Sequence, residues 1–180
     1  LVPDFPVLTP PAFIGRTSPP RAFYGMDDAR EGARRFYDHV VPVDRNTHAV
    51  ERYLSLVDRL GVPITRPLRF PLPTGDPIAR FDDDEPFVLL HPFARGSRKS
   101  LSDLAVEEFC RALAPYRVVL AGRAKRELPV ADNCVNLLNH TSLLQLVWLL
   151  RHARYTVSVD SGPMHIASAL SDRLISIHTW

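Results

Sequence analysis

The chain has 180 residues, 46% of them hydrophobic, which is enough for one ordinary domain or two small ones. Its formal net charge is +2, from 22 basic and 20 acidic residues, so the charge balance gives no sign of a nucleic-acid-binding protein. No run approaches the roughly 18 apolar residues of a membrane-spanning helix, and no signal peptide is visible.

The prolines divide the chain into two unlike halves. Of the 17 prolines, only Pro115, Pro129 and Pro163 follow Pro92, so 14 lie in the first half. Proline removes a backbone donor and shortens strands. The early segments are therefore expected to be brief: short strands within residues 7–8 and 12–15, and a polar helix over residues 27–37.

The first strong helix signal covers residues 47–60. Its apolar residues recur every three to four positions, and Thr47 is a good N-cap. Gly61 ends the pattern. Residues 61–86 are then proline-rich and finally acidic, which is typical of a connector. The acidic run at 82–85 could instead ligate a metal ion, although such sites need oxygens that converge from a shaped loop.

From residue 86 onward, short apolar strands alternate with amphipathic helices. This order predicts an α/β fold, a Rossmann-like parallel sheet with helices on both faces. In the helix over 101–113, Ser102 or Ser100 is the expected cap, and the residues expected to pack inward are Leu104, Phe109, Ala112 and Leu113. The expected strands are 87–92, 117–122, 133–138, 155–159 and 174–178, and the other helices are 142–152, capped by Thr141 or Ser142, and 163–170.

Two features that suit an anion follow different strands of this sheet. Asp160, Ser161 and Gly162 form a strand-to-helix turn, where backbone N–H groups and the helix dipole attract phosphates. The loop over residues 95–99 carries three cations, Lys99 among them. Because parallel strands end at one edge of a sheet, both features are expected to face the same ligand. A diphosphate held between the helix N-terminus and Lys99 would be stabilised without a metal ion.

Other readings of these residues stay open. Asp160 could cap the following helix, and Lys99 could be a solvated cation. His91 and His165 are expected to be structural, and Arg95 could steer an anion or do nothing. Cys110 and Cys134 are isolated and indicate unpaired thiols in a reducing compartment. Neither a G-x-G-x-x-G nor a P-loop pattern occurs, so a standard dinucleotide site is not expected.

The run D-S-G-P-M-H-I-A-S-A-L at 160–170 resembles the D-[TS]-G-x-x-H-[IL]-A-x-A-L signature of glycosyltransferase family 9, the bacterial lipopolysaccharide heptosyltransferases. Residues 91–99 are similar to the donor loop of that family. The family pattern K-x-W-P is absent, because Ser100, Leu101 and Ser102 follow Lys99. The resemblance extends over most of the chain, including residues 14–15 and the helix before Gly61.

The resemblance implies the C-terminal half of a GT-B fold. Residues 1–80 would be a remnant of the N-terminal acceptor domain with a linker, and residues 81–180 the nucleotide-sugar-binding Rossmann-like domain. Both ends of the chain look cut. Donor and phosphate binding is carried over to Lys99, Asp160, Ser161, Gly162, Thr141, Phe93, Ala94 and Glu127, with Arg95 and His165 as further candidates. The general base is expected in an N-terminal stretch that this chain lacks, so the chain alone should not transfer sugar.

The same resemblance implies the chemistry. The enzyme would transfer a sugar, with heptose from ADP-heptose as the first candidate, to a lipopolysaccharide or other glycan acceptor with inversion and without a metal cofactor. Its expected partners are a nucleotide-sugar donor and a glycan or lipid A-core acceptor, and no nucleic acid. It would lie in the cytoplasm, with at most peripheral association at the inner face of the inner membrane. The alternatives are a non-catalytic sugar-nucleotide-binding module and a GT-B-shaped epimerase.

Overall fold

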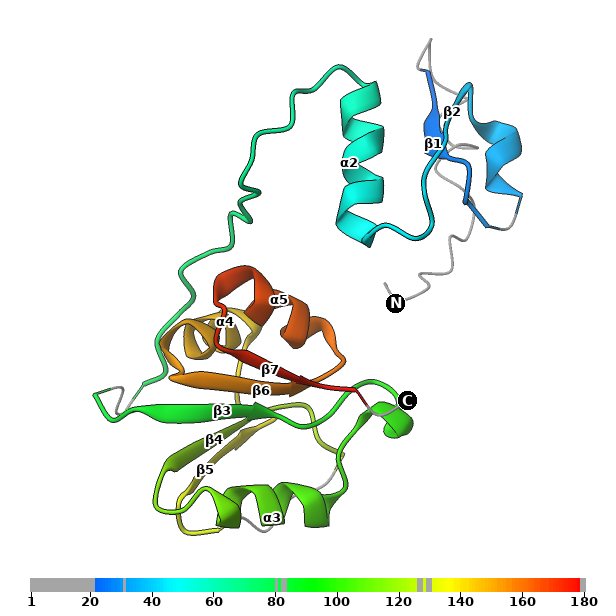
Figure 1. Ribbon diagram of the computed structural model, residues 1–180. Helices are drawn as coiled ribbons and strands as arrows, with labels where there is room; N and C mark the ends of the chain where they lie inside the picture. Colours follow the sequence, from blue (N-terminus) through cyan, green and yellow to red (C-terminus); the bar gives the residue numbers. More distant parts are fainter. Residues whose placement is uncertain are drawn as a thin grey trace. The chain divides into compact units, whose positions relative to one another are not determined.

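The computed structural model describes residues 22–30, 32–79, 81, 84–125, 128 and 131–178. The chain divides into two compact units, and the boundary between them along the sequence lies between Leu68 and Arg69. The expected strands at residues 7–8 and 12–15 lie outside the described residues, as do Asp82 and Asp83 of the acidic run. Figure 1 shows the elements of each unit.

The first unit contains a two-stranded parallel sheet, a 3₁₀ turn and one long helix. Its elements are β1 (Tyr24–Met26), η1 (Ala33–Phe36), β2 (His39–Val41) and α2 (Ala49–Arg59). The expected helix over residues 27–37 is wrong, because Gly32 adopts a left-handed conformation with φ 74° and only one short turn follows it. The cap of α2 is His48 rather than Thr47, whose hydroxyl donates to the Asp44 carbonyl instead.

The second unit is a five-stranded parallel sheet with helices on both faces, as the sequence predicts. Its strand order is β5-β4-β3-β6-β7. In Figure 1, α3 covers one face of the sheet, and α4 and α5 cover the other. The elements are β3 (Phe87–His91), η2 (Ser97–Lys99), α3 (Asp103–Ala112), β4 (Arg117–Gly122), β5 (Cys134–Leu138), α4 (Leu143–His152), β6 (Tyr155–Val159), α5 (Gly162–Leu170) and β7 (Leu174–Ile177).

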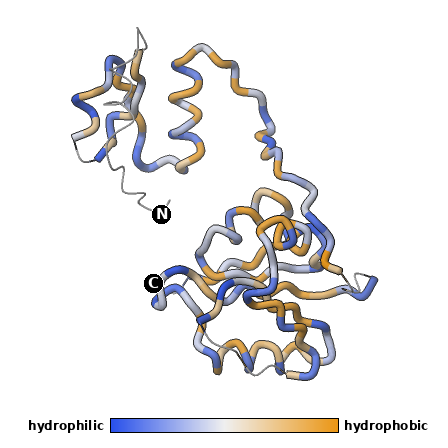
Figure 2. Tube along the Cα trace, turned by 180° about the vertical axis from the view of Figure 1, so that it is seen from behind, coloured by the Kyte–Doolittle hydropathy of each residue, from blue (hydrophilic) through white to orange (hydrophobic). Residues whose placement is uncertain are grey.

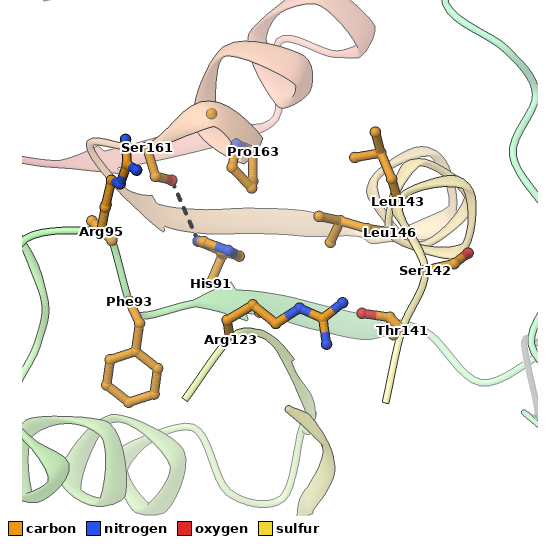
Figure 3. Close-up of a pocket in the computed structure, with 13 residues that line it drawn as sticks. His91, Phe93, Arg95, Arg123, Thr141, Ser142, Leu143, Leu146, Ser161 and Pro163 are labelled. Carbon is orange, nitrogen blue, oxygen red and sulfur yellow. Dashed lines mark hydrogen bonds between the residues drawn. The ribbon is translucent and has the colours of Figure 1, made fainter. Parts of the chain in front are cut away.

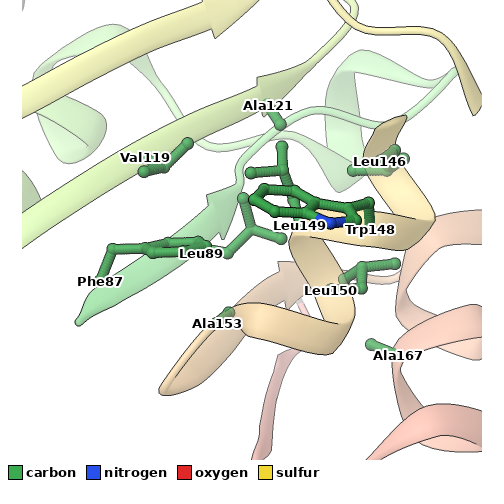
Figure 4. Close-up of a cluster of buried hydrophobic side chains, with 10 residues drawn as sticks. All are labelled: Phe87, Leu89, Val119, Ala121, Leu146, Trp148, Leu149, Leu150, Ala153 and Ala167. Atoms are coloured by element: carbon green, nitrogen blue, oxygen red, sulfur yellow. The ribbon is translucent and has the colours of Figure 1, made fainter. Parts of the chain in front are cut away.

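Alternation along the strands supplies a separate hydrophobic core to each face of the sheet. Leu89 and Val119 pack with α4 and α5, and Figure 4 shows Leu149 and Trp148 of α4 in this cluster. Strand residues whose side chains point to the other face, such as Leu90, Val118 and Leu120, pack beneath α3. In Figure 2, hydrophobic residues run through the strands of the second unit, whereas hydrophilic and hydrophobic residues alternate along α2.

The buried stripe of α3 differs from the expected one. Leu104 is 62% exposed and Ala112 is also exposed, whereas Val106 and Cys110 are buried. Phe109 and Leu113 do pack on the core. The stripe thus runs through positions 106, 109, 110 and 113, which are spaced as one helical face, and Leu104 lies outside that face.

The helix caps follow the sequence closely. Ser102 caps α3, and Ser142 caps α4 through a full capping box with Gln145. In α5 the first helical residue is Gly162, so Pro163 takes the second position rather than the first. Cys110 and Cys134 are both free. No helix in the described part of the chain is long and apolar enough to cross a bilayer.

A segment of the expected connector packs directly on α4. We call residues 72–76 the strap. The Arg151 guanidinium donates to the carbonyls of Leu72 and Pro73, and the Asp76 N–H donates to the Leu144 carbonyl. Gly75 has φ 87°, and a Cβ there would overlap the backbone nitrogen of Trp148. Glycine therefore allows the strap to approach the helix backbone.

We expect Gly75→Ala to lower the free energy of unfolding of the second unit by about 1 to 3 kcal/mol, since it adds both strain at positive φ and a clash with α4. Urea unfolding followed by tryptophan fluorescence measures the loss. Gly96→Ala is the matched control, because Gly96 has φ −98° and nothing within 4 Å of an added Cβ. Equal losses in the two variants would show that the strap does not pack on α4.

Candidate functional site

The candidate site lies where the strand order of the sheet reverses. From β3 the chain proceeds to β4 and β5 on one side, whereas β6 and β7 lie on the other side. β3 and β6 are parallel neighbours, with His91 opposite Ser158. The loops after these two strands diverge in opposite directions and leave a crevice at their carboxyl ends, which is where open α/β sheets bind ligands.

The turn after β6 presents the N-terminus of a nine-residue helix to this crevice. Ser161 is the N-cap of α5, but its side chain makes no capping hydrogen bond. Its hydroxyl instead donates to the Val159 carbonyl at 3.0 Å. The positive end of the helix dipole at Gly162 is therefore left uncapped by a side chain, an arrangement that suits an anion.

An ion pair joins the loops after β3 and β6. Lys99 Nζ lies 2.7 Å from Asp160 Oδ2, although the two residues are 61 positions apart. The Asp160 side chain is 8% exposed and that of Lys99 is 36% exposed. The hydrogen bond from Lys99 lowers the pKa of the Asp160 carboxyl, against the opposing effect of burial, so Asp160 is ionised. Asp160 thus serves as the partner of Lys99, and the helix cap is Ser161.

The loop after β3 is itself held by hydrogen bonds. The Ser100 hydroxyl accepts a hydrogen bond from the Ala94 N–H at 2.9 Å and lies within donating distance of the Ala94 and Gly96 carbonyls. η2 follows Gly96 and ends at Lys99. The lysine is therefore presented from a closed loop at the same edge of the sheet as Ser161.

A cavity of about 470 Å³ opens beside this ion pair (Figure 3). It is lined by residues from the ends of β3, β4 and β6 and from the N-terminal turns of α4 and α5. The lining residues are His91, Phe93, Ala94, Arg95, Gly122, Arg123, Thr141, Ser142, Leu143, Leu146, Ser161, Gly162 and Pro163. Its two arginines make it cationic, and its leucines, proline and phenylalanine give it apolar walls.

A family model for glycosyltransferase family 9 (heptosyltransferase) matches residues 4–180. The chain belongs to glycosyltransferase family 9. Its expected resemblance to that family is thereby confirmed. Among curated proteins, no sequence matches the chain.

Solved structures agree with the family and the GT-B-type fold. E. coli heptosyltransferase WaaC with ADP matches with a TM-score of 0.67 and 26% identity, over 86% of this chain and 54% of that chain. E. coli ADP-heptose lipopolysaccharide heptosyltransferase II matches with a TM-score of 0.67 and 23% identity, over 92% of this chain and 58% of that chain. A family 9 structure from Veillonella parvula matches with a TM-score of 0.55 and 15% identity, over 82% of this chain and 48% of that chain. The chain therefore spans a little over half the length of the two E. coli proteins.

The site residues predicted for a family 9 member fall into three groups. Phe93, Ala94, Arg95, Thr141, Ser161 and Gly162 line the cavity. Lys99 and Asp160 meet each other beside it, with His165 Nε2 4.0 Å from the second oxygen of Asp160 and 61% exposed. Glu127 lies outside the described residues. Their roles in binding a donor stay predictions.

Sequence reasoning missed Arg123, which is exposed and lines the cavity from the loop after β4. Asn139 holds this loop. Its side-chain amide exchanges two hydrogen bonds of 3.0 Å with the backbone of Ala124, and its own N–H donates to the Gly122 carbonyl. The Arg123 guanidinium donates to the Asn139 carbonyl at 3.3 Å. Because β4 was expected from the sequence, a cation directly after it could have been assigned to this edge.

His91 was expected to be structural, but it also lines the cavity. Its side chain is buried, and the ring packs against Gly122, where an added Cβ would lie 2.9 Å from Nε2. Burial lowers the pKa of His91 to about 4, so the imidazole is neutral near pH 7. In the described part of the chain, no three His, Cys, Asp or Glu side chains gather as a metal-ligand set.

The pKa of His91 makes stability depend on pH. In the unfolded chain the imidazole has a pKa near 6.5, so between pH 6.5 and 4 the unfolded state binds a proton that the folded state does not. The contribution of the neutral His91 to the free energy of unfolding is therefore complete above pH 6.5 and is lost as the pH falls toward 4. We expect the free energy of unfolding to fall by about 3 kcal/mol over this range in wild type, and this pH dependence to be absent in His91→Gln. Chemical denaturation at pH 7, 5.5 and 4.5 tests this, with the exposed His140→Gln as control. The same pH dependence in both variants would contradict a buried neutral His91.

Proposed function

We propose that this chain is the donor-binding part of a heptosyltransferase-like glycosyltransferase and that its cavity holds a nucleotide sugar, with ADP-heptose as the first candidate. The observation that supports this most is the Lys99–Asp160 pair beside the uncapped N-terminus of α5. A diphosphate in the crevice would meet the ammonium group of Lys99, the positive end of a helix dipole and the cavity arginines. The similarity to E. coli heptosyltransferase WaaC with ADP and to E. coli ADP-heptose lipopolysaccharide heptosyltransferase II supports the same class of ligand.

The proposed reaction forms one bond and breaks one bond at the anomeric carbon of the sugar. An acceptor hydroxyl gives its proton to a general base and attacks C1, and the bond from C1 to the diphosphate oxygen breaks. The electron pair leaves with the diphosphate, toward Lys99 and the Ser161–Gly162 turn. Attack from the side opposite the leaving group inverts the configuration. Fixed cations and backbone dipoles would stabilise the departing charge, so no metal ion is invoked.

The acceptor and the complete enzyme belong to the same proposal. Since the chain spans 54% and 58% of the two E. coli proteins, transfer is proposed for a protein that also has a complete acceptor domain, and donor binding for this chain. The proposed acceptor is a lipopolysaccharide core or another glycan, reached at the cytoplasmic face of the inner membrane by peripheral association.

Phe93 and Ala94 favour a second candidate, a sugar-nucleotide-binding module without transferase activity. Both residues line the cavity, but neither has the hydroxyl that the family resemblance implies for a donor contact. Calorimetric titration with ADP-, UDP- and GDP-sugars identifies the ligand under both candidates. Incubation of ADP-heptose and acceptor with the full gene product then separates them. A glycosylated acceptor indicates a transferase, an isomerised sugar nucleotide indicates an epimerase, and binding without turnover indicates the module.

Removing the charge of Lys99 should weaken nucleotide binding. We expect Lys99→Ala to raise the Kd for ADP by about tenfold or more at low salt, the size of a lost charged hydrogen bond, and by less at high salt because ions screen the interaction. Calorimetry at 20 mM and 500 mM NaCl, as roughly one-tenth and several times physiological ionic strength, measures both effects.

Arg111→Ala is the matched control for this experiment. Arg111 is also a cation with a carboxylate partner, Glu107 at 2.6 Å, but it lies exposed on α3 away from the cavity. Its removal should leave the Kd for ADP unchanged. An equal change in the two variants, or an unchanged Kd in Lys99→Ala, would contradict the assignment of Lys99 to the donor diphosphate.

A further inference from the structure

The floor of the cavity contains a buried polar side chain that the proposed function does not yet use. His91 is the last residue of β3 and is only 6% exposed. It lies between Ser161, whose Oγ is 3.4 Å from its Nδ1, and Gly122, which faces its Nε2. The missing side chain of Gly122 leaves room for the ring at this position.

The hydrogen bonds around Ser161 determine which nitrogen of His91 carries the proton. Ser161 has one hydroxyl hydrogen, and it donates that hydrogen to the Val159 carbonyl at 3.0 Å. With that hydrogen used, we assign Nδ1 of His91 as the donor of the 3.4 Å contact and Ser161 Oγ as its acceptor. Nε2 of the neutral ring is left with a lone pair.

Nε2 is open to the cavity. It makes no hydrogen bond to the described part of the protein. Among the described residues, the Nε of Arg52 is the one fully buried side-chain nitrogen or oxygen without a hydrogen-bond partner. Nε2 of His91 also lacks a partner but is not in that class, so it is not fully buried and keeps some accessible surface. Because His91 lines the cavity, this surface faces the ligand space in Figure 3. The ring of His91 thus offers a bound ligand a neutral acceptor at the floor of the cavity.

Burial keeps His91 neutral, and cations lie close to its site. Arg95 and Arg123 line the same cavity from the loops after β3 and β4, and Lys99 is paired with Asp160 beside the neighbouring turn. Burial lowers the pKa of His91 and so disfavours its imidazolium form. A neutral acceptor complements a hydroxyl and does not complement a phosphate oxygen, which is itself an acceptor.

We propose that Nε2 of His91 accepts a hydrogen bond from a hydroxyl group of the bound nucleotide sugar, which makes His91 a specificity-determining residue of the donor site. This inference rests on the proposed function, since it presumes that a nucleotide sugar occupies the cavity. Two parts of such a ligand carry hydroxyls, the ribose and the transferred sugar. The chemistry recognised is the same for both, and the experiment separates them.

The test compares affinity ratios in the full chain and in two variants of His91. His91→Asn keeps a polar group near the Nδ1 position, facing Ser161, and has nothing at Nε2. His91→Gln keeps a polar group near the Nε2 position. Calorimetry gives the Kd values of ADP, 2′-deoxy-ADP, 3′-deoxy-ADP and ADP-heptose for each protein, with His140→Gln as the control for loss of an exposed histidine.

We expect the wild-type chain to prefer one hydroxyl-bearing ligand by about threefold to tenfold, the value of one hydrogen bond. This preference should persist in part in His91→Gln and disappear in His91→Asn. If it lies in the ratio of a deoxy nucleotide to ADP, the partner is the ribose. If it lies in the ratio of ADP to ADP-heptose, the partner is the sugar. Thermal unfolding of each variant shows whether it is folded, and a ratio of two ligands on one folded variant is not moved by a merely structural role.

Three results would overturn the inference. The first is that neither ratio differs between wild type and His91→Asn. The second is that the wild-type chain shows no hydroxyl preference at all. The third is an ADP affinity that rises as the pH falls from 7.5 to 5.5 in wild type but not in His91→Gln, since His91 would then act as a cation. Failure of ADP and ADP-heptose to bind at all would instead refute the proposed function.

Discussion

The parallel pairing of β3 with β6 is the constraint on which the candidate site depends. It places His91 opposite Ser158, so that the loops after the two strands begin at adjacent points on the same edge of the sheet before they diverge. Lys99 and Asp160, 61 residues apart, then come within 2.7 Å. A shift of register by one residue would turn every side chain of β3 to the other face of the sheet. Leu89 and Leu90 would then exchange cores and the packing of both cores would be lost, so the packing that stabilises the unit also fixes the position of the site.

Most of the second unit could be predicted from the sequence because its signals are local. Strand and helix periods alternate, serines at 102 and 142 cap their helices, and Asp160 to Gly162 form the expected turn. The two wrong predictions, the helix over 27–37 and the buried face of α3, also have physical causes. A glycine at positive φ ended the helix expected over 27–37, and the inward face of α3 depended on which side the sheet lay. Propensity can place a helix, but only its packing decides which apolar residues are buried.

The candidate site also contains residues that the sequence predicts and residues that it does not. Thr141, Ser161 and the loop from Phe93 to Arg95 are found at the cavity because each directly follows a strand or begins a helix. His91 carries no such signal, and the position of Arg123 directly after β4 indicates the edge of the sheet but not that its side chain lines the cavity. Their place depends on Gly122, whose φ of 136° and missing side chain let the ring of His91 approach β4, and on Asn139, which holds the loop that carries Arg123. These are contacts between distant segments, and a single sequence does not reveal them.

Among the described residues, the charges at the crevice are arranged to suit an anion. The buried carboxylate of Asp160 has a cation as its partner, and the cavity itself is lined by Arg95 and Arg123. The floor between the loops is neutral because burial lowers the pKa of His91. Positive walls and a neutral accepting floor match a ligand with a charged end and a hydroxyl-bearing body.

The strap packs on α4, the same helix that lines one wall of the cavity. α4 lines the cavity with Leu143 and Leu146 at its first turns, and the same helix holds the strap through Leu144, Trp148 and Arg151. Leu146 lies in the core as well, so this turn cannot shift without opening a void against the sheet. The strap and the cavity therefore contact the same helix, and the packing of Leu146 on the sheet holds the turn that lines the cavity.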